Sequence, residues 1–387
     1  MISRKHTIAP WLVSLLAMAV LQSGLPTIAD AQKGPQERQQ GDAPSYKQMV
    51  IAAIDEHILP NLDDFARKAD ELSEAVGKDC LPSDAKAASD VKAAFTAAVS
   101  SWARVATDRI GPARKRDRAT RISFWPDPRG IVRRQMRGIL ANRDEALLQP
   151  AAIEKQSVAV QGLPALEILL FSSPSSEKPE ERKYRCELAQ AIAANVAKQA
   201  EDMKAGWMGA QGWRETMLTP GPENKIYKTE ADVAAEVVKS YLTALQIIRD
   251  NQVLPWLDAV TKSKTWARLP FESAGLSQAY LANQIASLGE LHRELGLDAY
   301  AKQIAAKDEK KKWIVDWLPN AYKGMAKQAS QLQLPAQAAK DKSTDIKQKT
   351  RALARLKFFT NGLRQIVGRE IVPATGLFLG FNELDGD

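Results

Sequence analysis

The sequence is poor in the residues that most often carry catalysis or cross-linking. Its 387 residues include three His and two Cys, and aromatic residues make up 6% of the chain. It contains no His-Glu-x-x-His pair, no Gly-x-Ser-x-Gly turn, no P-loop and no dinucleotide-binding fingerprint. A zincin mechanism, a serine-hydrolase elbow and nucleotide-dependent chemistry therefore have no support, and we expect no cofactor and no metal.

Glycine and proline are also scarce beside alanine. The chain has 21 Gly and 20 Pro against 59 Ala, and Ala is the strongest helix former. No long run alternates between apolar and polar residues with a period of two, as a half-buried strand would. The composition therefore predicts an all-α fold and excludes disorder, collagen and a small disulfide-stapled fold.

The longest apolar run without charges lies near the N-terminus. It extends from Ile8 to Leu21, follows Arg4 and Lys5, and precedes the small-x-small sequence that ends at Ala31. This order predicts a cleavable Sec-type signal peptide over residues 1–31 and a location in the periplasm or cell envelope. No later run approaches the length of about 20 residues that a membrane helix needs, so we expect no transmembrane segment in the mature chain.

Cys80 and Cys186 both lie in the part of the chain that would be exported. Thiols in exported proteins tend to pair, so the sequence predicts one disulfide between them. The alternative is two separate buried thiols.

Apolar residues at helical spacing predict two helical bundles. Residues 32–45 are polar and are expected to form a flexible leader, residues 46–208 an N-terminal bundle, and residues 209–387 a C-terminal bundle. The clearest stripe follows Ser83, a credible N-cap, and consists of Ala88, Val91, Phe95, Ala98, Trp102 and Val105.

Turn residues and apolar spacing set the other expected boundaries. Gly111 and Pro112 should end the preceding helix and begin an Arg-rich loop, after which helix resumes as far as about Asn142. Helices are expected near 151–171 and 180–208, and a polar segment near 337–349. Three further stripes predict helices in the second bundle, over 233–248, 314–325 and 353–366.

Basic residues are concentrated in one segment. From Arg104 to Arg137, ten Arg and one Lys stand against three Asp, a local charge of +8. Arg forms bidentate contacts with carboxylate and phosphate groups. The segment is either a solvated face or a site for an anionic small ligand, an envelope surface or an envelope protein partner. Nucleic acid is not expected as a partner of an exported protein.

Two histidines remain once the predicted signal peptide is removed. His57 lies on the inner side of its predicted helix with Val50 and Ile54, so we expect an interior side chain. His292 lies among charged residues at 290–294, so we expect a surface side chain.

Several motifs occur in an order that resembles the imelysin family. They are Ile110-Gly111-Pro112 followed by Phe124-Trp125-Pro126-Asp127-Pro128, the apolar segment from Val160 to Phe171, and the terminal segment from Leu379 to Asp387. The resemblance covers about residues 46–387. It implies an exported bacterial cell-envelope protein with two helical-bundle domains, associated with iron-regulated uptake and classified as a peptidase.

The family signature, Gly-x-His-x-x-Glu, aligns with residues 162–167 but lacks its His. Gly162 and Glu167 carry over, whereas Pro164 occupies the position of the His and cannot ligate a metal. Pro164 is expected to kink a helix and shape a groove. The signature is therefore expected to form a pocket and to hold no catalytic metal.

Glu167 lies in an otherwise apolar segment and would need a partner if buried. The Arg-rich segment offers Arg109 or Arg121. We therefore expect a ligand-binding pocket formed by Gly162, Pro164, Glu167, Arg109, Arg121, Trp125 and Asp127.

Two functional hypotheses follow. The first is a non-catalytic binding protein of the cell envelope, associated with uptake of iron or another nutrient. The alternative is an imelysin-type peptidase, which would need an activated water or a nucleophile that the sequence does not reveal. Four residues near the C-terminus have side-chain oxygen atoms that could bind a hard cation or could simply be solvated. They are Asn382, Glu383, Asp385 and Asp387.

Overall fold

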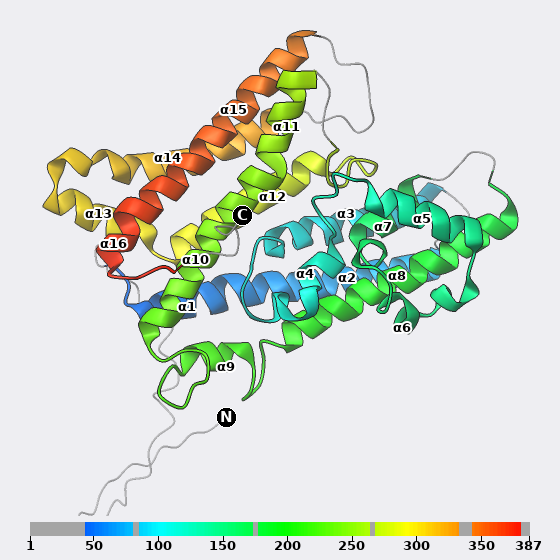
Figure 1. The fold of residues 1–387 in the computed structure, drawn as a ribbon, viewed down its shortest axis with the longest axis horizontal. Helices are drawn as coiled ribbons and strands as arrows, with labels where there is room; N and C mark the ends of the chain where they lie inside the picture. The colour runs from blue at the N-terminus through cyan, green and yellow to red at the C-terminus, as the bar shows by residue number, and fades with distance from the viewer. Residues whose placement is uncertain (1–42, 80–84, 173–176, 264–267, 333–342, 381–387) are drawn as a thin grey trace, which may run out of the picture. The chain divides into compact units, whose positions relative to one another are not determined.

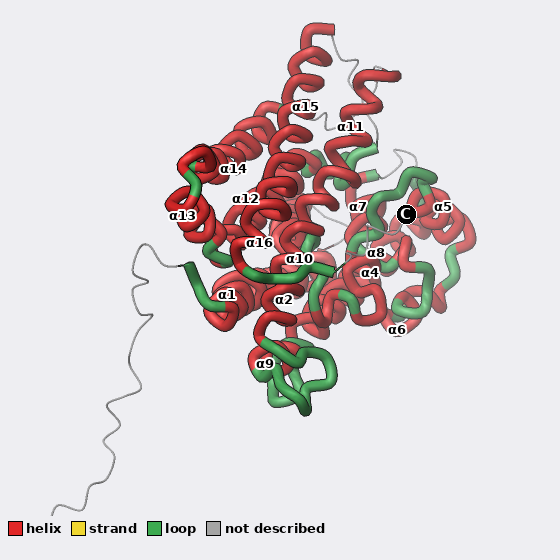
Figure 2. The backbone as a smooth tube through the Cα atoms, turned by 60° about the vertical axis from the view of Figure 1, so that its left-hand side comes forward, coloured by secondary structure: helices red, strands yellow, loops and turns green. Residues whose placement is uncertain are grey.

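The computed structural model describes residues 43–79, 85–172, 177–263, 268–332 and 343–380. Within these ranges every regular element is helical and no strand occurs (Figure 2). The all-α prediction is confirmed. The described residues belong to one compact unit, and their division into two bundles stays a prediction.

The chain contains both long and short helices (Figure 1). The α-helices are α1 (Tyr46–Ala52), α2 (Leu59–Asp79), α3 (Ala85–Val105), α4 (Arg118–Ile122), α5 (Ile131–Asn142), α6 (Pro150–Ile153), α7 (Leu163–Phe171), α8 (Pro179–Ala205), α9 (Trp213–Leu218), α10 (Glu230–Ile248), α11 (Leu254–Asp258), α12 (Ser277–Glu294), α13 (Leu297–Lys307), α14 (Trp313–Gln331), α15 (Ser343–Ile366) and α16 (Val372–Thr375). Short 3-10 or π-helical turns connect or extend them: η1 (Ala53–Ile58), η2 (Gly111–Ala113), η3 (Lys115–Asp117), η4 (Glu145–Leu148), η5 (Val158–Val160), η6 (Arg249–Val253), η7 (Ala259–Ser263), η8 (Glu309–Lys311) and η9 (Val367–Ile371).

The predicted apolar stripes form the core. On α3, Phe95 and Trp102 are fully or almost fully buried, and the Trp102 ring lies 5.1 Å from the Phe65 ring of α2. Figure 1 shows α2, α3 and α8 running side by side, and α3 also packs against α12. Ser83, the expected N-cap, lies outside the described residues. The stripes on α10, α14 and α15 likewise face the interior, with only Trp317 and Phe359 partly buried.

Three expected boundaries were wrong. The helix expected over 151–171 is divided, because α6 ends at Ile153 and α7 begins at Leu163. Pro164 lies in the first turn of α7, where a missing N–H leaves no helical hydrogen bond unmade, so it starts a helix and does not kink one. The Arg-rich loop contains α4, and the last residues of the expected polar segment 337–349 belong to α15.

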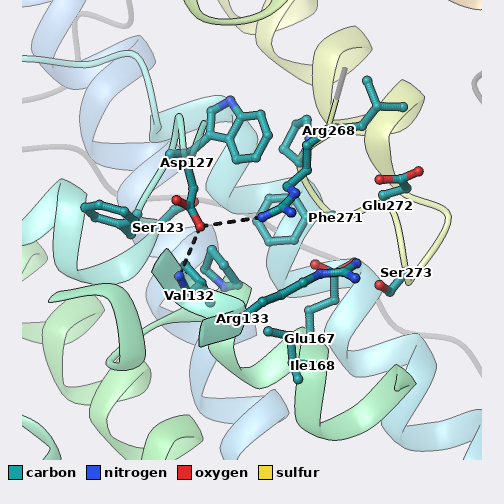
Figure 3. A pocket seen from close by; sticks show the side chains of 15 residues that line it. Ser123, Asp127, Val132, Arg133, Glu167, Ile168, Arg268, Phe271, Glu272 and Ser273 are labelled. Atoms are coloured by element: carbon teal, nitrogen blue, oxygen red, sulfur yellow. Dashed lines mark hydrogen bonds and ion pairs between the residues drawn. The ribbon is translucent and has the colours of Figure 1, made fainter. Parts of the chain in front are cut away.

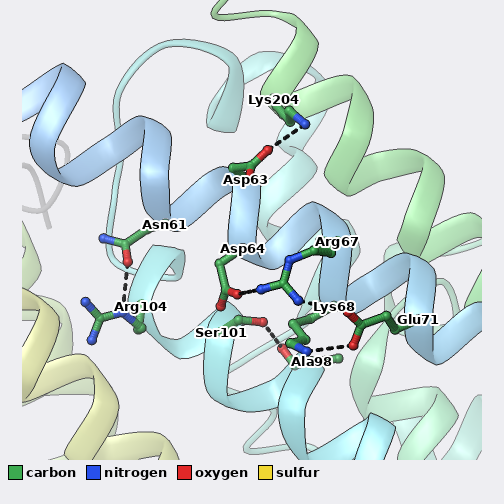
Figure 4. Close-up of polar contacts among 10 residues, drawn as sticks. All are labelled: Asn61, Asp63, Asp64, Arg67, Lys68, Glu71, Ala98, Ser101, Arg104 and Lys204. Carbon is green, nitrogen blue, oxygen red and sulfur yellow. Dashed lines mark hydrogen bonds and ion pairs between the residues drawn. The ribbon is translucent and has the colours of Figure 1, made fainter. Parts of the chain in front are cut away.

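Charged side chains tie α2 to its neighbours (Figure 4). Arg104 of α3 donates from Nε to the side-chain oxygen of Asn61 at 2.8 Å and pairs with Glu290 of α12. Lys204 of α8 lies 2.7 Å from Asp63 of α2. Arg104 therefore connects three helices, and it is not part of a uniform solvated face.

His57 is interior, as predicted. It is 2% exposed, its Nε2 lies 3.3 Å from the hydroxyl of Ser287 on α12, and its Nδ1 lies 3.5 Å from the Asn61 amide nitrogen. Burial, helped by the nearby Arg104 charge, lowers the pKa of His57 from 6.5 to about 4. The neutral imidazole is therefore part of the packing between α12 and the N-terminal helices.

The surface position expected for His292 is wrong. The side chain is 1% exposed because it follows Leu288 by four residues on the buried face of α12. Its Nδ1 lies 3.1 Å from the Tyr241 hydroxyl and its Nε2 3.0 Å from a carboxylate oxygen of Asp298. The Tyr241 hydroxyl also lies 2.6 Å from that of Tyr322. These four side chains form a hydrogen-bonded chain between α10, α12, α13 and α14, which runs from the buried His292 and Tyr241 to the partly exposed Asp298 and Tyr322.

Tyr241→Phe should lower the free energy of unfolding by about 1 to 3 kcal/mol, because it removes a hydrogen-bond partner from both His292 and Tyr322. Urea unfolding followed by circular dichroism measures the loss. Tyr184→Phe is the matched control, since that hydroxyl makes a single bond, to the Asp144 carbonyl. Equal losses from both variants would contradict a special role for the hydrogen-bonded chain.

Two sequence predictions concern residues that are only partly described. Cys186 is half-buried on α8, but Cys80 lies outside the described residues, so the disulfide stays a prediction. The described helices include none that is both long and apolar enough to cross a membrane. The predicted signal peptide also lies outside the described residues.

Candidate functional site

A cavity of about 50 Å³ lies where α7 meets the segment before α5 and the loop before α12 (Figure 3). Its apolar walls include Phe124, Trp125 and Phe271. Its charged lining includes Glu167, Asp127, Arg133, Arg268 and Glu272. A volume of this size holds about three to five water-sized atoms, the size of one carboxylate or phosphate group.

Gly162 sets the position of α7. A Cβ atom at this residue would lie 2.1 Å from the Ile122 carbonyl oxygen and 2.3 Å from that of Arg121, at the end of α4. No side chain fits there, so the start of α7 packs directly on the α4 backbone. The signature glycine therefore places Pro164 and Glu167 at the cavity without lining it.

Glu167 is a buried carboxyl group held by backbone. It is 8% exposed, and its Oε1 accepts a hydrogen bond of 2.9 Å from the backbone N–H of Ala274. Burial raises the pKa of Glu167 from 4.5 to about 7, although the N–H groups of Ala274 and Ser273 and the Arg133 charge act in the opposite direction. Near neutral pH the group can therefore donate or accept a proton.

The partner expected for Glu167 was wrong. Arg121 donates to the backbone carbonyls of Arg116 and Glu154 and to the side chain of Gln161, so it holds the α4 region together. Arg109 lies in a different cavity. Arg133 is the nearby cation, and Figure 3 shows its side chain extending towards Glu167.

Asp127 anchors the opposite wall. Its two carboxylate oxygens accept from the backbone N–H groups of Ile131, at 2.7 Å, and Val132, at 3.0 Å, at the start of α5. Arg268 lies 3.9 Å from the same carboxylate. A Cβ on Gly130, which has a φ of +63°, would lie 2.8 Å from the Arg268 guanidinium, so this glycine leaves room for it.

Trp125 completes this wall, since its ring nitrogen donates to the carbonyl of Asn251 at 3.3 Å. The peptide bond between Trp125 and Pro126 is cis.

The loop before α12 was missed by the sequence analysis. Phe271 has a φ of +54°, an uncommon conformation for a bulky residue, and is held by the rings of Phe95 and Tyr280 at 6.2 and 5.1 Å. The bend directs the N–H groups of Ser273 and Ala274 towards Glu167. In the sequence, only Pro270 and Gly275 indicate a turn here. They do not indicate that the turn contacts Glu167.

Arg109 lies in a second cavity, of about 300 Å³, with Arg114 and Lys239. Leu379 and Gly380 line the same cavity, and the acidic residues that follow lie outside the described residues. The structure thus brings together Pro164, Glu167, Trp125 and Asp127, and places Gly162, Arg109 and Arg121 elsewhere.

The peptidase classification of the resembled family implies a metal, and the residues at the signature do not fit one. Pro164 offers no ligand atom, and an oxygen of Glu167 is already bonded to backbone. In the part of the chain that the structure describes, no three His, Cys, Asp or Glu side chains are grouped for metal binding. The side chains at the signature therefore do not form a metal site.

Comparisons with known proteins agree with the fold. The chain resembles an imelysin-like protein from Psychrobacter arcticum 273-4, with a TM-score of 0.68 and 18% identity over 88% of this chain and 99% of that one. It also resembles a structure described as an iron-regulated protein A precursor, from Parabacteroides distasonis ATCC 8503, with a TM-score of 0.54 and 15% identity over 84% and 96% of the two chains. No curated protein sequence matches significantly. The imelysin family model matches residues 58–356, and the chain therefore belongs to the imelysin family.

Proposed function

We propose that this chain is an exported binding protein of the cell envelope, associated with uptake of iron or another nutrient, and that the Glu167 cavity holds an anionic group of a small ligand. The main support is a carboxyl group with a pKa of about 7 near Arg133, in a cavity that Arg268 also lines. One structural relative is described as an iron-regulated protein, which supports the link to uptake.

Two arginines of the lining can hold an anion beside the carboxyl groups of Asp127, Glu167 and Glu272. Arg133 and Arg268 reach the cavity from its exposed rim and can form charge-assisted hydrogen bonds with a carboxylate or phosphate. Protonated Glu167 can donate one more hydrogen bond. The apolar walls lower the local dielectric constant and so strengthen these contacts. Binding should therefore be tighter when Glu167 is protonated.

The peptidase alternative rests on the same pKa. A carboxyl group titrating near pH 7 is suited to act as a general base on a water molecule. The alternative also requires a group that polarises the peptide carbonyl, and Arg133 could serve in that role. The two hypotheses predict different behaviour when Glu167 is replaced.

Citrate and inorganic phosphate should bind the purified protein in isothermal titration, about tenfold more tightly one pH unit below the pKa of Glu167 than one unit above it. Arg133→Gln and Arg268→Gln should each weaken binding by about tenfold or more, the effect of losing a charged hydrogen bond. Lys225→Gln, on an exposed loop, is the matched control and should change nothing.

Absence of binding, or equal effects of Lys225→Gln and Arg133→Gln, would contradict the proposal. Cleavage of casein that disappears in Glu167→Gln would replace it by the peptidase alternative. One transition-metal ion per chain in the native protein, absent from Glu167→Gln, would also favour the peptidase alternative.

A further inference from the structure

Helices α14 and α15 carry an exposed group of aromatic side chains, which we call the aromatic patch: Trp313, Trp317, Phe358 and Phe359. Phe358 is 60% exposed and Trp313 51% exposed. The ring of Trp317 lies 6.3 Å from that of Phe358 and 6.5 Å from that of Phe359, and the two Phe rings are 5.5 Å apart. Trp313 precedes Trp317 by one helical turn and so lies on the same face of α14.

Two helical glycines seat the partly buried rings of the patch. A Cβ on Gly324 would lie 2.4 Å from the Phe359 ring, and a Cβ on Gly362 would lie 2.4 Å from the Trp317 ring. Glycine inside a helix destabilises it by about 1 kcal/mol relative to alanine. Both helices therefore give up stability at the places where the edge of an aromatic ring reaches the backbone of the partner helix. This seating holds Trp317 and Phe359 in place and leaves Phe358 facing outward.

The same surface is basic. Residues 346–369 contain seven Lys or Arg and no Asp or Glu, and Asp345 and Glu370 flank this stretch. One of the seven, Lys349, is buried. Arg351, Arg355 and Lys357 are exposed and lie within two helical turns of Phe358. On α14, Lys323 and Lys327 are exposed as well, against a single exposed acid, Asp316.

We propose that the aromatic patch and its basic rim bind the surface of an anionic lipid bilayer. Trp and Phe rings partition into the boundary between headgroups and acyl chains, and adjacent Lys and Arg side chains are attracted to anionic headgroups. A second copy of this chain fits less well, since a two-fold contact through the patch would bring its basic rim against itself. The patch lies on α14 and α15, whereas the Glu167 cavity is lined by α7 and the loops before α5 and α12, so this inference stands independently of the proposed ligand.

Co-sedimentation of the purified mature protein with lipid vesicles tests the proposal. Vesicles of phosphatidylethanolamine and phosphatidylglycerol in equal parts should bind the protein, and pure phosphatidylcholine vesicles should bind it at least about tenfold more weakly. Phe358→Ser should weaken binding to the anionic vesicles about tenfold and Arg355→Gln about fivefold. Added salt should weaken binding further.

Two control variants match these changes at other exposed positions. Met208→Ser removes a side chain that is 56% exposed, and Arg182→Gln removes an exposed arginine on α8. Neither should alter vesicle binding, and none of the four variants should alter the circular dichroism spectrum or citrate binding. Equal binding to neutral vesicles, equal effects of Met208→Ser and Phe358→Ser, or a dimer in analytical ultracentrifugation that Phe358→Ser dissociates would each overturn the proposal.

Discussion

Glu167→Gln should stabilise the protein above pH 7, by up to about 3 kcal/mol, and should leave its stability nearly unchanged below pH 4.5. The reason is that burial raises the pKa of Glu167 from 4.5 to about 7. The folded state therefore favours the neutral acid, and the stability that this group contributes is lost as the pH rises from 4.5 through about 7. A shift of about 2.5 pKa units corresponds to about 3 kcal/mol. Glutamine remains neutral and can still accept the hydrogen bond from Ala274.

Urea unfolding of the native protein and the variant across this pH range measures the difference. Exposed Glu223 provides the control, since Glu223→Gln should change the free energy of unfolding by less than about 0.5 kcal/mol at every pH. A variant at Glu167 that is less stable than the native chain at high pH would show that the loop before α12 stabilises the charged carboxylate, and the raised pKa would then be wrong.

The stability of Glu167→Gln must be compared with that of the native protein at each pH, because other buried groups also titrate between about pH 4 and pH 7. The pKa of His57 is lowered to about 4, so its contribution to stability is lost as the pH falls from 6.5 towards 4. Asp108, whose pKa burial raises to about 7, acts in the same direction as Glu167. The contributions of His57 and Asp108 to the pH dependence of stability partly cancel in the native chain. Both contributions are the same in the variant, so they do not affect the difference in unfolding free energy.

Gly162→Ala should lower the free energy of unfolding by about 3 kcal/mol or more. The added Cβ would lie 2.1 Å from a backbone oxygen of Ile122, a contact that no side-chain rotation can relieve. Either α4 or α7 must move, and Glu167 would move with α7. The same variant should therefore also weaken citrate binding. A loss of stability confined to the contact between α4 and α7 would leave citrate binding unchanged.

Gly138 on α5 provides the matched control for this substitution. A Cβ at that position would meet nothing within 4 Å, and the residue lies inside a regular helix. Gly138→Ala should therefore raise the free energy of unfolding by about 1 kcal/mol, as alanine does in helices. Thermal and urea unfolding of the two variants would contradict the close-packing explanation if both lost stability equally.

Features that depend on neighbours along the chain could be predicted from the residues alone. Helical spacing of apolar residues located the buried faces of α3, α10, α14 and α15, because a period near 3.6 is a local property of the backbone. The motifs shared with imelysins identified the family and placed Trp125, Asp127, Pro164 and Glu167 at one cavity.

Tertiary packing alone decided which side chains those residues meet. Ala274, the partner of Glu167, lies 107 residues further along the chain, and only the packing of the strained turn at Phe271 brings the two together. Charged neighbours in the sequence suggested an exposed His292, yet its face of α12 packs against α10. Arginines that are close in the Arg-rich segment lie in different parts of the structure, because helix packing places Arg109 in one cavity, Arg133 in another and Arg121 against the α4 region. Contacts between distant segments depend on how whole helices pack, and no local pattern of residue types encodes them.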